Sequence, residues 1–277
     1  MLTVYEDSLR HRLCLEDMFA RGSTSLLYLV GRDVVYKRYE SDGWIDFSIK
    51  EQKLELQALE SIDDVIIPFG KVFDGADETS NSIITGHLMP KVRVGKLANL
   101  SQVFTSLKLS LKDKVGRAIE AENITVNCHK SSSHIIIGDA NSSNFFLNKK
   151  GILKFGDFDN VGIGDFPFDA PSYYTLMAKR LLGDIEGQDI DRVAFGLMAL
   201  EELCEPRDQL GIAGGIRYQY IDRSQLMEQI DVLHMPVNSK EMFREIVSDT
   251  KRKPYIGEAI KEIGKLEGHF LTKGRRC

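Results

Sequence analysis

The sequence predicts an α+β fold with a small β-rich part that carries one helix, residues 1–90, and a larger α-rich part, residues 91–277. Three observations predict it. Apolar runs rich in β-branched and aromatic residues fill the first third of the chain, helical apolar spacing dominates the rest, and a short glycine-bearing segment separates the two. The 277 residues are 43% hydrophobic, enough to bury a sizeable core in one large domain or in two lobes.

The N-terminal part is predicted to hold a small antiparallel sheet. The runs "SLLYLV" and "VVYKRY" flank a turn at residues 31–33, which indicates a hairpin. Apolar residues recur near helical spacing over residues 45–62, so one helix is expected there. Two more strand-like runs, "VIIPFGKVF" and "IITGHLMP", follow, and "KVRVGKL" is predicted to be a hinge near residues 90–95.

The C-terminal part is predicted to be helical over three long stretches. They are "LSQVFTSLKLSLKDKVGRAIEAENI", "DRVAFGLMALEEL" and "EMFREIVSDTKRKPYIGEAIKEIGKLE". One segment interrupts them: "IIIGDANSSNFFLNKKGILKFGDFDN", residues 135–160, has two apolar runs around a glycine-containing turn and is typical of a β-hairpin.

Carboxylate and amide side chains gather at the open ends of this hairpin. Antiparallel pairing is expected to bring Asp139 and Asn144 close to Asp157. An Asn and an Asp supply oxygen ligands of the kind that Mg²⁺ prefers, and Asp139 can accept a hydroxyl proton. Taken singly, each of these residues is more typical of a turn, and it is their convergence on one point that favours a site.

The segments "IGDANSSN" and "GDFDN" together resemble the catalytic loop and the metal loop of the protein-kinase-like superfamily. "ARGSTSLLYLV", with Gly22 and Ser23, is similar to a degenerate glycine-rich loop, and "VVYK" is similar to the strand that carries the phosphate-binding lysine, here Lys37. Glu55 stands at the position of the helix glutamate that pairs with this lysine, with Glu51 as a competing candidate. "DRVAFGLMALEEL" resembles the helix whose aspartate supports the catalytic loop.

The resemblance covers about residues 16–265 and implies a bilobal protein-kinase-like fold that uses ATP and Mg²⁺. Its catalytic residues are then Asp139, Lys37 and Glu55, and Asp191 would support the loop. The implied nucleotide-binding and metal-binding residues are Gly22, Ser23, Lys37, Met89 and Val92 for the nucleotide and Asn144 and Asp157 for the metal.

Several positions depart from the superfamily pattern. Ala20 and Ser25 replace the outer glycines of the phosphate loop, and the loop reads Ile137-Gly138-Asp139 instead of H-R-D. Residues 140–143 carry no Lys or Arg to neutralise the transferred phosphate, and Asp159 replaces the glycine of D-F-G. Three functions therefore stay open: an atypical Ser/Thr protein kinase, a pseudokinase that binds nucleotide or a partner, and a small-molecule kinase of the aminoglycoside or choline type.

Composition limits the expected surroundings of the protein. The formal net charge of −5 argues against nucleic acid or an anionic membrane as the main partner. The resemblance implies a protein substrate. No signal peptide and no apolar run of membrane-spanning length is recognised, so a cytoplasmic protein is predicted. The four cysteines are scattered, which predicts neither a zinc site nor a disulfide framework.

Overall fold

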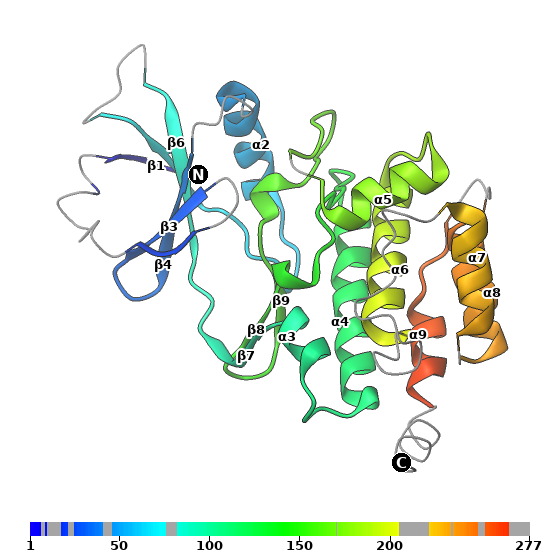
Figure 1. Ribbon diagram of the computed structural model, residues 1–277. Coiled ribbons are helices and arrows are strands. Elements are labelled where there is room, and N and C mark those ends of the chain that lie inside the picture. The colour runs from blue at the N-terminus through cyan, green and yellow to red at the C-terminus, as the bar shows by residue number, and fades with distance from the viewer. Residues whose placement is uncertain are drawn as a thin grey trace.

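The structure is a computed structural model that describes ten stretches of the chain. They are residues 1–6, 9, 18–21, 25–40, 46–75, 82–169, 171–204, 222–233, 235–248 and 253–265. Figure 1 shows the large sheet and helix α2 at one end of the molecule and most of the helices at the other. The predicted α+β class is confirmed.

The large sheet has six strands in the order β1-β5-β6-β4-β3-β2. Their bounds are Leu2–Tyr5 (β1), Met18–Arg21 (β2), Ser25–Val30 (β3), Val34–Tyr39 (β4), Gly70–Phe73 (β5) and Ile84–Pro90 (β6). The predicted hairpin is present as β3 and β4, which pair antiparallel around a turn where Gly31 has a φ of 69°. Strand β1, which pairs parallel with β5, was not predicted.

Helix α2 spans Phe47–Leu59, and Asp46 caps it by accepting hydrogen bonds from the backbone of Ser48 and Ile49. The helix was predicted, but its buried face is not the apolar one. Leu59 is 82% exposed, whereas the buried positions are Lys50, Lys53, Leu54 and Gln57. These two lysines are buried because each forms an ion pair with a carboxylate of residues 159–169.

A second sheet of three strands lies between the large sheet and the helices (Figure 1). Its strands are Val94–Asn99 (β7), Phe145–Asn148 (β8) and Leu153–Phe155 (β9), in the order β7-β8-β9. The chain enters it through residues 91–93, inside the predicted hinge. Part of that predicted hinge is thus strand β7, while the division into domains 1–90 and 91–277 stays a prediction.

The remaining helices pack around α4 and α6, which lie side by side in Figure 1. Their bounds are Leu100–Thr105 (α3), Leu111–His129 (α4), Tyr173–Leu182 (α5), Gln188–Cys204 (α6), Arg223–Val232 (α7), Val237–Ile246 (α8) and Gly257–Gly264 (α9). Two of the predicted long helices are each divided in two. A capping box begins α4, in which Ser110 and Asp113 satisfy each other's backbone N–H groups.

Two apolar clusters form the core of the described residues. The larger one joins the helices to β8 and β9, with Phe145, Phe155 and Phe195 fully buried in it. The smaller one lies on the large sheet around Tyr36 and Val72. Among the residues that the structure describes, no helix has the length and apolar character needed to cross a lipid bilayer.

Candidate functional site

The hairpin of β8 and β9 brings the predicted oxygen ligands to one place. Phe145 pairs with Phe155, and the Gly156 N–H donates to the Asn144 carbonyl at 2.8 Å, so the positions just outside the two strands are neighbours. Asn144 immediately precedes the first strand, and Asp157 follows the second. The Asn144 Nδ2 donates to Asp139 Oδ2 at 2.7 Å. The predicted convergence of Asp139, Asn144 and Asp157 is therefore present.

Asp191 of α6 supports the loop that carries Asp139. This carboxylate is completely buried, and it accepts the backbone N–H groups of Ile137 at 2.6 Å and Gly138 at 2.7 Å. His129 Nε2 donates to the same carboxylate at 2.8 Å. Asp191 thus makes the supporting contact that the sequence predicts, and two backbone donors and one ring donor fix its position.

Gly138 is required at its position for two reasons. Its φ is +66°, a conformation that side chains disfavour, and a Cβ added there would overlap the ring of Phe168. The arginine of the H-R-D pattern therefore has no space in this chain, because Phe168 occupies it.

Gly138→Ala is expected to destabilise the protein by about 1–3 kcal/mol, through backbone strain and displacement of Phe168. The measurement is urea unfolding followed by circular dichroism. Gly116→Ala is the control, since Gly116 is exposed within α4 with open space around it. That change is expected to stabilise the protein by about 1 kcal/mol, as alanine favours helix. Equal effects of both changes would contradict the crowding described at Gly138.

Lys37 lies on β4 and is 4% exposed. Its Nζ forms ion pairs with Asp157 and, at 2.8 Å, with Asp159 Oδ1. Burial alone would lower the pKa of Lys37, but the charges of Asp157 and Asp159 outweigh it and raise that pKa above its ordinary value. Lys37 is therefore charged, and its ammonium group lies against the carboxylate of Asp157.

The predicted pair between Lys37 and Glu55 does not form. Glu55, whose side chain is 57% exposed, accepts instead from Lys71 Nζ of β5 at 2.6 Å, and Glu51 accepts from the same nitrogen at 2.7 Å. The reason is the orientation of α2, which turns both glutamates away from Lys37 and presents lysines in their place.

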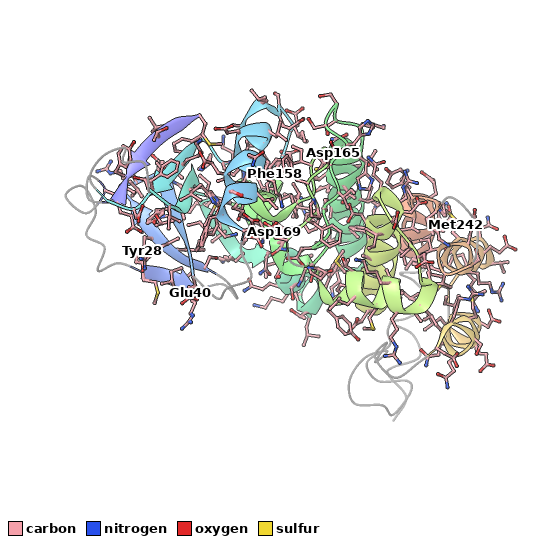
Figure 2. The ribbon with its side chains drawn as sticks, turned by 90° about the horizontal axis from the view of Figure 1, so that it is seen from above. Tyr28, Glu40, Phe158, Asp165, Asp169 and Met242 are labelled. Carbon is pink, nitrogen blue, oxygen red and sulfur yellow. The ribbon has the colours of Figure 1, made fainter. Side chains whose placement is uncertain are left out.

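Two lysines of α2 complete a buried network of charges. Lys50 Nζ donates to the Asp159 carbonyl at 2.7 Å and to Asp169 Oδ2 at 2.5 Å. Lys53 Nζ donates to Asp169 Oδ1 at 2.6 Å. Figure 2 labels Asp169 and Phe158 beside α2, and the short turn of residues 158–160 packs against that helix. Three lysines and three aspartates therefore balance each other.

Asp159 is the centre of this network. Burial would raise the pKa of the carboxyl, but Lys37 and Lys50 together hold it well below its usual range. Lys53 behaves in the opposite way: burial lowers its pKa although Asp169 opposes the shift. Asp159 is therefore ionised while buried, and it contacts the lysine that the sequence assigns to the phosphates.

His87 of β6 lies next to the network without sharing its charge. Burial, helped by the charges of Lys37 and Lys50, lowers the pKa of His87 to about 3, so its ring is neutral at physiological pH. Its Nδ1 is 2.8 Å from the Tyr39 hydroxyl. The neutral ring of His87 therefore lies beside Asp159 without adding a fourth cation to the three lysines.

Asp139 has a pKa of about 6. Burial raises it most and the charge of Asp157 adds to this, whereas the Asn144 hydrogen bond and Lys37 lower it. A carboxylate with a pKa near the working pH is well matched to accepting a proton from a hydroxyl group.

The residue set fits Mg²⁺. The Asn144 amide N–H donates to Asp139, which leaves the amide oxygen of Asn144 for another partner. Asp157 supplies a carboxylate that is partly exposed. Mg²⁺ prefers one or two protein oxygens together with phosphate and water. No cluster of three or more His, Cys, Asp or Glu side chains suited to a metal is found in the described stretches.

The remaining predicted residues are less tightly connected to this cluster. Met89 lies two positions after His87 on β6 and shares its face of the sheet. Val92 lines a separate cavity that contains none of Lys37, Asp139 or Asp157. Gly22 and Ser23 lie outside the described residues.

Comparison with known proteins identifies no family. No protein-family model matches the chain, and no curated protein matches it. The chemistry of the site therefore rests on its geometry.

Four residues of the buried network were not predicted as site residues: Lys50, Lys53, Asp169 and His87. Asp159 was noted only as a departure from D-F-G. One signal was present in the sequence: Lys50 and Lys53 are three apart on one helical face, in the first two turns after Asp46. Lysines on a helix are normally solvated, and only the three-dimensional position of the aspartates changes that expectation.

Proposed function

We propose that this protein is an ATP- and Mg²⁺-dependent phosphotransferase, an atypical Ser/Thr protein kinase. The observation that carries the proposal is the convergence of a buried cation, a proton acceptor and two oxygen ligands. These are Lys37, Asp139, Asn144 and Asp157, which come from β4, from one loop and from the two open ends of one hairpin.

Each side chain has a role that its surroundings support. Lys37 would bind the α and β phosphates, and Asn144 and Asp157 would hold Mg²⁺, which would supply positive charge to the phosphate oxygens. Asp139 orients the acceptor hydroxyl and accepts its proton. The hydroxyl oxygen forms the new bond to the γ phosphorus while the bond to the bridging oxygen breaks and ADP leaves.

Asp159 takes the positioning role that the resemblance assigned to Glu55. It holds Lys37 from the metal loop itself, at 2.8 Å, and is in turn held by Lys50 of α2. Lys37 therefore keeps one buried carboxylate partner when Asp157 turns to another ligand. Lys71 binds both Glu51 and Glu55, which leaves neither of them for Lys37.

A pseudokinase is the second candidate function, and one observation favours it. Residues 140–143 are Ala, Asn, Ser and Ser, so the loop after Asp139 supplies no cation to the transferred phosphoryl group. Such a cation can change the rate by orders of magnitude. A protein that binds nucleotide at this site and transfers little phosphate is the expected result if no other cation replaces it.

Two measurements on the full chain separate these candidates. Thermal stability is measured with Mg²⁺ and ATP, each alone and together, and transfer of labelled γ-phosphate to the chain itself and to generic protein substrates is measured in parallel. Stabilisation together with transfer supports the kinase, and stabilisation without transfer supports the pseudokinase. Absence of both contradicts the proposed function.

The proposed role of Asp139 predicts the pH dependence of the reaction. Its carboxylate must be deprotonated to accept a proton, so kcat/KM is expected to rise with pH through about 6 and then level off. The measurement is initial transfer rate against pH from 5 to 8 at fixed ionic strength. A rate that is constant over this whole range would contradict the role of Asp139 as proton acceptor.

A further inference from the structure

A cavity of about 700 Å³ lies at the link between the two sheets. We call it the hinge cavity. Its walls come from three separate segments, and its lining residues are Val65, Ile66, Pro90, Lys91, Val92, Arg93, Asn148, Lys149, Lys150, Ile152 and Lys154. None of Lys37, Asp139, Asn144 and Asp157 lines it, so it is distinct from the candidate phosphotransfer site.

The hinge cavity is strongly basic. Five of its eleven lining residues are Lys or Arg, and none is acidic, although the whole chain has a formal net charge of −5. Arg93 pairs with Asp33 at 2.6 Å and Lys154 with Asp64 at 2.8 Å. Lys91, Lys149 and Lys150 form no ion pair with any residue that the structure describes. Three cations around one cavity are thus available to an anionic partner.

Part of the lining of the hinge cavity is apolar. Val65, Ile66 and Val92 contribute aliphatic side chains, which we call the floor, and Ile152, which also lines the cavity, is 44% exposed. A free phosphate or another small anion would leave this apolar surface uncovered. The lining therefore suits a ligand that combines several negative charges with at least one aliphatic side chain.

Backbone hydrogen bonds fix the three walls relative to one another. The Lys149 N–H donates to the Arg93 carbonyl at 2.8 Å, the Lys91 N–H to the Asp33 carbonyl at 2.8 Å, and the Ile66 N–H to the Phe155 carbonyl at 2.8 Å. The turn between β8 and β9 is also held by Arg117, which donates to the Gly151 carbonyl at 2.7 Å. A ligand therefore meets a pre-formed site and loses little free energy in ordering it.

We propose that the hinge cavity binds an acidic segment of a partner protein, with an aliphatic side chain seated on its floor. Charge complementarity selects the acidic groups, and the exposed Ile152 selects the aliphatic one. The volume lies within the range of about 300–1,000 Å³ that is usual for ligand sites. This interaction goes beyond the proposed function and does not depend on it, because binding needs neither nucleotide nor Mg²⁺.

The test uses a fluorescein-labelled peptide of sequence Glu-Glu-Leu-Glu-Glu-Leu-Glu-Glu, titrated with the full chain and followed by fluorescence polarisation without nucleotide. Saturable binding that weakens as salt increases is expected. The double variant Lys149→Glu, Lys150→Glu is expected to bind at least about tenfold more weakly. The control is Lys108→Glu, Lys112→Glu, which makes the same change in net charge at two exposed lysines outside the cavity.

Two further comparisons separate a specific site from general attraction between charges. A peptide with Ser in place of Leu, and the variant Ile152→Ser, are each expected to weaken binding several-fold while the charges stay the same. Both charge-reversed variants are first checked for an unchanged melting temperature. If the Lys149, Lys150 variant fails to fold, Lys91→Gln replaces it.

Three results would overturn the proposal. They are no saturable binding of the peptide, equal weakening by the two charge-reversed variants, and binding that is insensitive to the loss of leucine and of Ile152. The last result would assign the cavity to small polyanions instead. Failure of the proposed kinase activity would leave all these measurements unaffected, so the two proposals are tested separately.

Discussion

Lys37→Met is expected to lower the rate of phosphate transfer by at least about 10³-fold, because it removes the only cation that forms an ion pair with Asp157 among the described residues. Methionine keeps the length of the side chain and has no charge for the phosphates. The measurement is the rate of transfer from labelled ATP at saturating Mg²⁺. Nucleotide-dependent thermal stabilisation should fall with it.

Lys71→Met is the matched control for this change. Lys71 is also a lysine on a strand of the large sheet, it pairs at the same register with His87, and its partners are Glu51 and Glu55. We expect the transfer rate of this variant to stay within about twofold of the unmodified protein, since the hydrogen bonds of Lys71 go to Glu51 and Glu55 and not to Asp139, Asn144 or Asp157. If Lys71→Met abolished transfer and Lys37→Met did not, the assignment of the phosphate-binding lysine would be wrong.

Asp159→Ala is expected to destabilise the protein by about 3–5 kcal/mol, because it leaves Lys37 and Lys50 buried without one of their carboxylate partners. The measurement is the free energy of unfolding from urea titration. Asp165→Ala is the control, since Asp165 is exposed on the same segment and is labelled in Figure 2. That change is expected to alter stability by less than about 0.5 kcal/mol.

A double variant distinguishes a charge effect from a packing effect. Lys50→Met in the Asp159→Ala background removes one of the unpaired cations, so we expect it to recover part of the lost stability. If the two changes simply added, Lys50 and Asp159 would not interact energetically. That result would contradict the buried network as described.

The sequence predicted the hairpin and the proximity of the polar side chains at its open ends, because both depend on local pattern. Two apolar runs around Lys149-Lys150-Gly151 specify an antiparallel pair, and antiparallel pairing by itself brings Asn144 and Asp157 together. The supporting contact of Asp191 was also predicted, from its place in the resemblance. The strands β1 and β7 were not predicted, because their pairing partners lie far away in the sequence.

The orientation of α2 could not be predicted, because long-range charge pairing overrides hydrophobic periodicity there. Apolar spacing favoured Ile49, Leu56 and Leu59 for the buried side. The structure instead buries Lys50 and Lys53, whose ammonium groups meet Asp159 and Asp169 more than one hundred residues later in the chain. The predicted pair of Glu55 with Lys37 failed for a related reason. The resemblance predicts the position of Glu55 along the helix, whereas the charge network determines the direction in which its side chain points.

A structure of the protein with Mg²⁺ and a non-hydrolysable ATP analogue tests the central claim most directly. We expect the metal between the side-chain oxygens of Asn144 and Asp157, Lys37 Nζ on the phosphates and still within hydrogen-bonding distance of Asp159, and Asp139 facing the γ phosphate. A nucleotide bound elsewhere, with Lys37 and Asp157 contacting neither phosphate nor metal, would contradict the account.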